Sequence, residues 1–177
     1  MSAPGSSVPP VSGRSETGQR AITATIMSAV SLFIIWWGIY PFSALVAIGA
    51  IVGLGEFYRF GERKGLRPGN RLGMIVTLFL LAAALFFDET TANHVLVVGL
   101  IVSFSVLLLR PHERVSPFLD SALTALGLIY VSWFFSFLIH LRKMPNGAAL
   151  ITLLIFASAF TDMGGYFIGR KYGRMKL

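Results

Sequence analysis

Six apolar stretches, each about as long as a membrane-spanning helix, dominate this sequence of 177 residues. A helix needs about 20 apolar residues to cross roughly 30 Å of hydrocarbon, where its backbone must satisfy its own hydrogen bonds. The stretches therefore predict an all-α integral membrane protein with about six transmembrane helices. A tight turn at Pro41 is expected after the first helix. The six cover approximately residues 21–40, from that turn to 60, 72–87, 94–109, 118–140 and 148–169.

Composition agrees with this prediction, because 55% of the residues are hydrophobic, 13% are charged and the mean hydropathy is +0.73. Soluble domains carry about 25% charged residues, so the composition argues against a water-soluble fold. The formal net charge of +7 does not indicate nucleic-acid binding, since the basic residues flank apolar runs and form no patch of their own. Cysteine is absent, which excludes disulfides and thiolate-bound metal sites.

The basic residues fall mainly on one side of the predicted helices. Only Arg142 and Lys143 fall on the other side, where the loop with Asp88 and Glu89 is acidic. Cytoplasmic loops carry the excess of Lys and Arg in membrane proteins, so we expect both termini in the cytoplasm and a multi-pass protein of the inner (cytoplasmic) cell membrane. The thirteen basic residues on the cytoplasmic side are Arg14, Arg20, Arg59, Arg63, Lys64, Arg67, Arg71, Arg110, Arg114, Arg170, Lys171, Arg174 and Lys176.

The first residues differ from the rest in composition. Residues 1–18 are rich in Ser, Pro and Gly and hold almost nothing that could be buried, so ordering them would cost entropy without return. We expect residues 1–18 to form a disordered cytoplasmic tail and residues 19–177 to form one polytopic membrane domain.

Asp162 is the most informative polar residue, because it lies about 14 residues into the sixth predicted helix, roughly 21 Å from its outer end. Ionisable groups at membrane depth are costly there and are functional candidates by default. On a helix, the polar and glycine residues that follow it share one face, at spacings of 3, 4, 7, 8 and 11 residues. The members of this face are Asp162, Gly165, Tyr166, Gly169, Arg170 and Gly173.

Two interpretations of this face stay open. In the first, the glycines let a ligand or another helix approach the backbone, Asp162 holds a cation and Arg170 holds a phosphate nearer the water. In the second, the two overlapping G-x-x-x-G spacings form a packing seam, and Asp162 is a buried carboxylate paired with Arg170. The pattern alone gives the two interpretations about equal weight.

The end of the sequence resembles a known family. The segment from Thr161 to Leu177, TDMGGYFIGRKYGRMKL, is similar to the segment D-x-G-A-Y-x-x-G-(R/K)-x-(F/Y)-G-(R/K)-x-K-L of the bacterial phosphatidate cytidylyltransferases, also called CDP-diacylglycerol synthases. Gly165 stands where that family usually has Ala. Arg20 before the first helix and Glu56 near the end of the second also resemble family positions. The resemblance covers the chain beyond the tail, and its last 17 residues are the most specific part.

The resemblance implies an enzyme of phospholipid biosynthesis that joins phosphatidate to CTP with the help of Mg²⁺, giving CDP-diacylglycerol and pyrophosphate. Such a transfer needs positioning and charge neutralisation more than covalent chemistry. Asp162 is then the expected catalytic residue and the candidate Mg²⁺ ligand. A homodimer of this chain is a further possible partnership. The residues expected to bind substrate are Tyr166, Arg170, Lys171 and Lys176, and those expected to shape the pocket are Gly164, Gly165, Gly169 and Gly173.

Members of that family continue after the Lys-Leu into an S-P-x-K-T-x-E-G segment and further helices, whereas this sequence stops at Leu177. It therefore looks like the N-terminal part of such an enzyme. Because Asp162 is taken as the single carboxylate at membrane depth, we hypothesise that residues 1–177 alone are inactive. The alternative is a non-enzymatic membrane protein, such as a small transporter or a scaffold subunit, whose sixth helix packs through its glycines.

Overall fold

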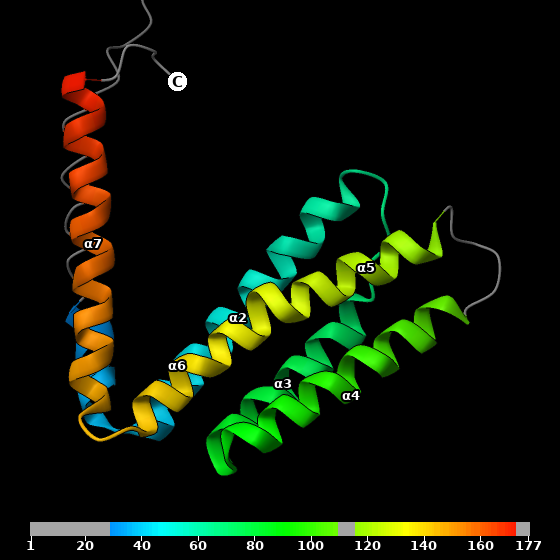
Figure 1. Ribbon diagram of the computed structural model, residues 1–177, viewed down its shortest axis with the longest axis horizontal. Coiled ribbons are helices and arrows are strands. Elements are labelled where there is room, and N and C mark those ends of the chain that lie inside the picture. The colour runs from blue at the N-terminus through cyan, green and yellow to red at the C-terminus, as the bar shows by residue number, and fades with distance from the viewer. Residues whose placement is uncertain (1–28, 110–115, 173–177) are drawn as a thin grey trace, which may run out of the picture.

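The computed structural model describes residues 29–109 and 116–172, and their regular structure is entirely helical. Residues 29–37 form a helical segment. The elements that follow it are α2 (Ile39–Glu62), α3 (Asn70–Phe86), α4 (Glu89–Leu108), α5 (Pro117–Gly127), the π-helical segment η1 (Leu128–Trp133), α6 (Phe134–Lys143) and α7 (Gly147–Tyr172), as Figure 1 shows. The prediction of an all-α protein is confirmed for these residues.

Four of the described helical runs are long and apolar enough to cross a membrane: Ile39–Glu62, Glu89–Leu108, Pro117–Lys143 and Gly147–Gly165. A fifth helix, α3, is apolar but shorter, with 17 residues. These runs correspond to five of the six predicted spans and support a multi-pass membrane protein. Most of the first predicted span and the predicted tail lie outside the described residues. The membrane side on which each helix end lies is still a prediction.

The break between the first two predicted spans lies at Gly38 and not after Tyr40. Gly38 has an extended backbone, with φ 164° and ψ 172°, and α2 begins at the next residue. Pro41 therefore lies inside the first turn of α2, where the amide hydrogen that it lacks would have no partner within the helix. The prediction of a turn at Pro41 is wrong by about three residues, because proline is tolerated at a helix start.

The fourth predicted span also begins earlier than expected, at Glu89 and not near His94. Asp88 is the N-cap of α4, and its Oδ1 accepts hydrogen bonds from the backbone N–H and the hydroxyl of Thr91. Such a cap satisfies amide groups that the first helical turn leaves without partners. The hydrogen bond from the Thr91 side chain lowers the pKa of Asp88. Hydropathy alone missed this polar first turn.

Helices α2 to α6 pack into one bundle (Figure 1), and residues of α2, α3, α4, η1 and α6 contribute to its main apolar core. The fully buried residues include the small Ala50 and Ala84, which let their helices approach closely. Thr77 on α3 and Ser132 in η1 join across this interior, with 2.6 Å between their hydroxyl oxygens. The outward faces carry large apolar side chains, as expected for helices that contact lipid tails.

Tyr58 is the largest fully buried side chain of the bundle, and glycines on two neighbouring helices make room for it. A Cβ at Gly73 on α3 would lie 2.5 Å from the Tyr58 hydroxyl oxygen, and one at Gly127 on α5 would lie 2.5 Å from the Tyr58 ring. The hydroxyl donates a hydrogen bond to the backbone carbonyl of Thr124, at 3.0 Å. Tyr58 therefore ties α2, α3 and α5 together.

Arg142 and Lys143, the two cations that did not fit the charge pattern, bond to the ends of neighbouring helices. Arg142 Nε donates to the carbonyl of Ile35 at 3.0 Å, and Lys143 Nζ donates to the carbonyls of Ala84 and Phe87 at the end of α3. The last carbonyls of a helix lack partners within it and carry partial negative charge. These two cations therefore have a structural role that explains their presence on a side where few basic residues are expected.

Candidate functional site

Helix α7, which carries the predicted site, leaves the bundle. It begins after a turn in which Asn146 has a positive φ of 60°, and it packs on α6 near its start, where Ile151 is buried in the main apolar core. Further along, its large side chains are exposed, for example Leu153 at 65% and Phe160 at 68%. Figure 1 shows the later turns of α7 standing apart from the other helices.

Asp162 lies on this outlying part of α7. It is 15 residues after Gly147, which places it about 22 Å along the helix at 1.5 Å per residue. The residue is exposed. Its predicted ion pair with Arg170 cannot be placed, because the Arg170 side chain lies outside the described part of the chain. In the described part of the structure, the carboxylate is therefore accessible to a ligand or to another protein segment.

The glycines beside Asp162 lie on an open helix surface. A Cβ at Gly164, Gly165 or Gly169 would have no atom of the described residues within 4 Å. The predicted helical spacing is confirmed, because α7 is a continuous helix through residue 172. The packing interpretation finds no partner helix for these glycines among residues 29–109 and 116–172.

The other predicted site residues are described only in part. Tyr166, Arg170 and Lys171 have helical backbones in α7, and their side chains lie outside the described residues. Gly173 and Lys176 lie wholly outside them. Their roles stay predictions that rest on helical spacing.

The predicted Mg²⁺ site is only partly supplied by these residues. Within residues 29–109 and 116–172, no group of three or more His, Asp or Glu side chains is placed to hold a metal ion. Mg²⁺ in proteins is commonly held by one or two carboxylates together with substrate phosphates and water. Asp162 fits as one such ligand, and the remaining ligands would have to come from elsewhere.

A buried carboxylate, which sequence reasoning missed, lies at the end of the bundle where α2 connects to α3. Asp120 in the first turn of α5 is 2% exposed, and its Oδ1 accepts a hydrogen bond from the backbone N–H of Arg67 at 2.6 Å. One turn later, the Thr124 hydroxyl accepts from the backbone N–H of Gly69 at 2.8 Å. The two side chains hold the connection between α2 and α3 against α5.

Asp120 is buried in the first turn of the membrane-length run Pro117–Lys143, beside the α2–α3 connection. The sequence feature that could have indicated this contact is the spacing of Asp120 and Thr124, which lie four residues apart on one face of an apolar helix. A polar pair at that spacing indicates that this face of the helix meets polar groups of another segment. That Asp162 is the single carboxylate at membrane depth stays a prediction.

Comparison with known proteins identifies the family of this chain. The model of the cytidylyltransferase family matches residues 18–177. The chain belongs to the cytidylyltransferase family. The match begins where the predicted tail ends and includes all of α2 to α7, so membership covers both the bundle and the helix that carries Asp162.

Two curated relatives are similar over most of the chain. One is the phosphatidate cytidylyltransferase of Synechocystis sp., 27% identical over 187 residues, and the other is the phosphatidate cytidylyltransferase of Bacillus subtilis, 27% identical over 167 residues. Each alignment covers 90% of this chain, and covers 62% and 60% of the two relatives. The chain thus spans about three fifths of their length. No solved structure matches it.

Proposed function

We propose that this chain is the N-terminal part of a phosphatidate cytidylyltransferase of phospholipid biosynthesis. Family membership and the two relatives support this function over a transporter or scaffold. In the proposed reaction, a phosphate oxygen of phosphatidate attacks the α-phosphorus of CTP. A new P–O bond forms as the bond between the α- and β-phosphates breaks, and pyrophosphate leaves. The products are CDP-diacylglycerol and pyrophosphate.

The observation that carries the proposed site is the open surface of α7. Asp162 is exposed there, and Gly165 and Gly169 on the same face leave the backbone uncovered. A nucleotidyl transfer needs a surface on which several phosphates can approach closely and have their charge neutralised. Glycines permit the approach, and a carboxylate can hold Mg²⁺, which would supply the neutralising charge.

The cations that follow on α7 have a complementary role in this proposal. Arg170 lies eight residues after Asp162, and Lys171 is next to it. On a helix, eight residues correspond to about 12 Å, which brings these side chains toward the predicted cytoplasmic surface. There Arg170, Lys171 and Lys176 would bind the phosphates of CTP and phosphatidate. Tyr166, between the carboxylate and the cations, would line the pocket.

The described residues supply one carboxylate to this site. A phosphoryl-transfer site with Mg²⁺ uses further ligands and bound phosphates, so we propose that residues 1–177 alone do not catalyse the reaction. Robust synthesis of CDP-diacylglycerol by purified residues 1–177 would contradict that statement. It would leave the assignment to the family untouched.

The test of the proposed function is Asp162→Asn, made in the protein together with any sequence that its gene encodes after Leu177. The amide keeps the size of the side chain and loses the charge, so formation of CDP-diacylglycerol from labelled CTP is expected to fall by more than about 100-fold, as for other electrostatic groups in active sites. Membrane insertion, measured by alkaline extraction, should not change.

The matched control is Thr161→Val, which changes the neighbouring residue. The Thr161 hydroxyl bonds to the carbonyl of Ala157 within α7, and its loss is expected to leave activity within about twofold. Retained activity in Asp162→Asn would show that the carboxylate is not part of the catalytic machinery.

A further inference from the structure

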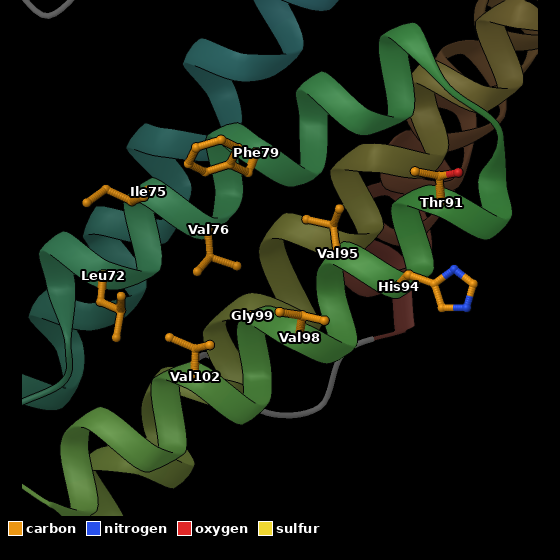
Figure 2. A pocket seen from close by; sticks show the side chains of 10 residues that line it. All are labelled: Leu72, Ile75, Val76, Phe79, Thr91, His94, Val95, Val98, Gly99 and Val102. Carbon is orange, nitrogen blue, oxygen red and sulfur yellow. The ribbon is translucent and has the colours of Figure 1, made fainter.

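An apolar groove of about 420 Å³ lies between α3 and α4, within the bundle and away from the site on α7. Figure 2 shows its side chains along the two helices, with Leu72 and Val102 at one end and Thr91 and His94 at the other. The walls between these ends are aliphatic or aromatic. They are formed by Ile75, Val76 and Phe79 of α3 and by Val95, Val98 and Val102 of α4.

A close contact of the two helices forms the floor of the groove. A Cβ at Gly99 of α4 would overlap Val76 of α3, so the backbones approach closely there. The rims stand further out, since Phe79 is 67% exposed and Val98 is 58% exposed. The groove is therefore a narrow channel that runs along the helices and is open on its outer side.

The groove is about as long as one acyl chain, which covers half of a bilayer. From Thr91 to Val102 the groove follows α4 over eleven residues, which is about 16 Å at 1.5 Å per residue. Half of a hydrocarbon core of roughly 30 Å is about 15 Å. One acyl chain lying parallel to α4 would fill the channel from end to end.

One cation lies at the Leu72 end of the groove. Arg71 immediately precedes Leu72 and is exposed. It shares a helical stripe with Ile75 and Phe79, at spacings of four and eight residues. Side chains of a helix lean toward its N-terminus, so Arg71 extends past the end of the apolar channel. Arg63 and Lys64, both exposed, lie in the connection before α3.

The connection that leads into α3 and Arg71 is fixed in place. The Asp120 carboxylate and the Thr124 hydroxyl hold the backbone amides of Arg67 and Gly69, as described above. Guanidinium and ammonium groups near a membrane surface attract anionic lipid headgroups. The groove therefore has an apolar channel that suits an acyl chain, and next to it a fixed cationic end that suits a phosphate.

We propose that this groove binds one anionic phospholipid, with its headgroup phosphate at Arg71 and one acyl chain between α3 and α4. The bound lipid is a structural ligand of the bundle and not the substrate, because neither α3 nor α4 takes part in the site on α7. A zwitterionic lipid could place a chain in the same channel but would gain less from the cation. The proposal does not depend on the reaction that the protein catalyses.

The experiment is native mass spectrometry of the full chain after transfer from nanodiscs of equal parts phosphatidylglycerol and phosphatidylcholine into mild detergent. We expect one phosphatidylglycerol to stay bound in preference to phosphatidylcholine, by about fivefold for each cation in contact. Arg71→Gln should reduce that preference by about fivefold. Arg59→Gln, the same change of charge on α2, should leave it unchanged.

The acyl-chain part of the site is tested by Val98→Trp, which fills the groove and should abolish retention of either lipid. Its control is Val97→Trp, since Val97 is 51% exposed on the same helix but does not line the groove. Circular dichroism of both variants shows whether the fold is kept. Equal retention of the two lipids by the unchanged chain, or loss of lipid in both tryptophan variants alike, would overturn the proposal. The proposal would also be overturned if Val98→Trp changed the oligomeric mass of the protein without changing lipid retention. In that case a second copy of the chain, and not a lipid, would occupy the groove.

Discussion

Helices α2 and α7 have equally apolar sequences but very different surroundings. The most apolar parts of both have a mean hydropathy of 1.6, yet 28% of that part is buried in α2 and 11% in α7. The glycines show the same contrast. A Cβ at Gly49 or Gly61 of α2 would press on Phe135 or Leu123, whereas one at Gly165 of α7 would meet no described atom within 4 Å. Hydropathy thus identifies a membrane helix but does not show whether other helices cover it.

This difference separates two uses of glycine in one chain. In the bundle, glycines accept large side chains from neighbouring helices and so support stability. On α7 they leave a bare backbone beside an exposed carboxylate, which suits a site where another group approaches. If this comparison is right, substitutions in the bundle will change stability, and matched substitutions on α7 will not.

The largest expected effect on stability is that of Tyr58→Ala. Tyr58 is fully buried between α2, α3 and α5, and removing a buried aromatic ring costs about 3–5 kcal/mol. The free energy of unfolding should fall by that amount in a titration with SDS, followed by circular dichroism in mild detergent. The control is Phe160→Ala on α7, where the ring is 68% exposed, and it should change the value by less than about 0.5 kcal/mol. Equal losses in the two variants would mean that α7 is as tightly packed as the bundle.

A smaller effect is expected from adding one methyl group. In Gly73→Ala the new Cβ would lie 2.5 Å from the Tyr58 hydroxyl oxygen, and such overpacking costs about 1–3 kcal/mol. Gly165→Ala adds the same methyl group to open space on α7 and should leave the free energy of unfolding unchanged or slightly higher. The same SDS titration measures both. A loss in Gly165→Ala as large as that in Gly73→Ala would show that the α7 glycines are already packed.

Much of the fold could be predicted from the sequence, because membrane length and helical spacing are local properties. The predicted ends of α3 agree with the structure within two residues, and the face of Asp162, Gly165 and Gly169 lies on a continuous helix as expected. Hydropathy misplaced the starts of α2 and α4, which follow Gly38 and Asp88. These starts depend on proline tolerance and on capping by a side chain. Both effects act within one turn and do not alter the apolar pattern.

What could not be predicted depends on contacts between distant segments. The π-helical segment Leu128–Trp133 interrupts an apolar run without any change in composition. The burial of Asp120 becomes intelligible only when the α2–α3 connection is seen to present its amides to α5. Likewise, the exposure of the α7 face depends on which helices lie opposite it. A single sequence does not show which helices are neighbours.

The smallest expected effect comes from the corner at which α7 leaves the bundle. Lys143 Nζ bonds to the carbonyl of Ala84 at 3.1 Å and also to that of Phe87 at the end of α3. In Lys143→Met the stem length is kept while the charge and its hydrogen bonds are lost, so the free energy of unfolding should fall by about 1 kcal/mol. The matched variant Arg63→Met removes an exposed cation at the opposite end of the bundle and should cost less than about 0.5 kcal/mol. If both variants lose the same amount in the SDS titration, net charge and not the contact with α3 determines the effect. A loss of stability in Lys143→Met alone would show that the turn between α6 and α7 is fixed to the bundle by this contact. The start of α7 would then be held in place while its later turns leave the bundle.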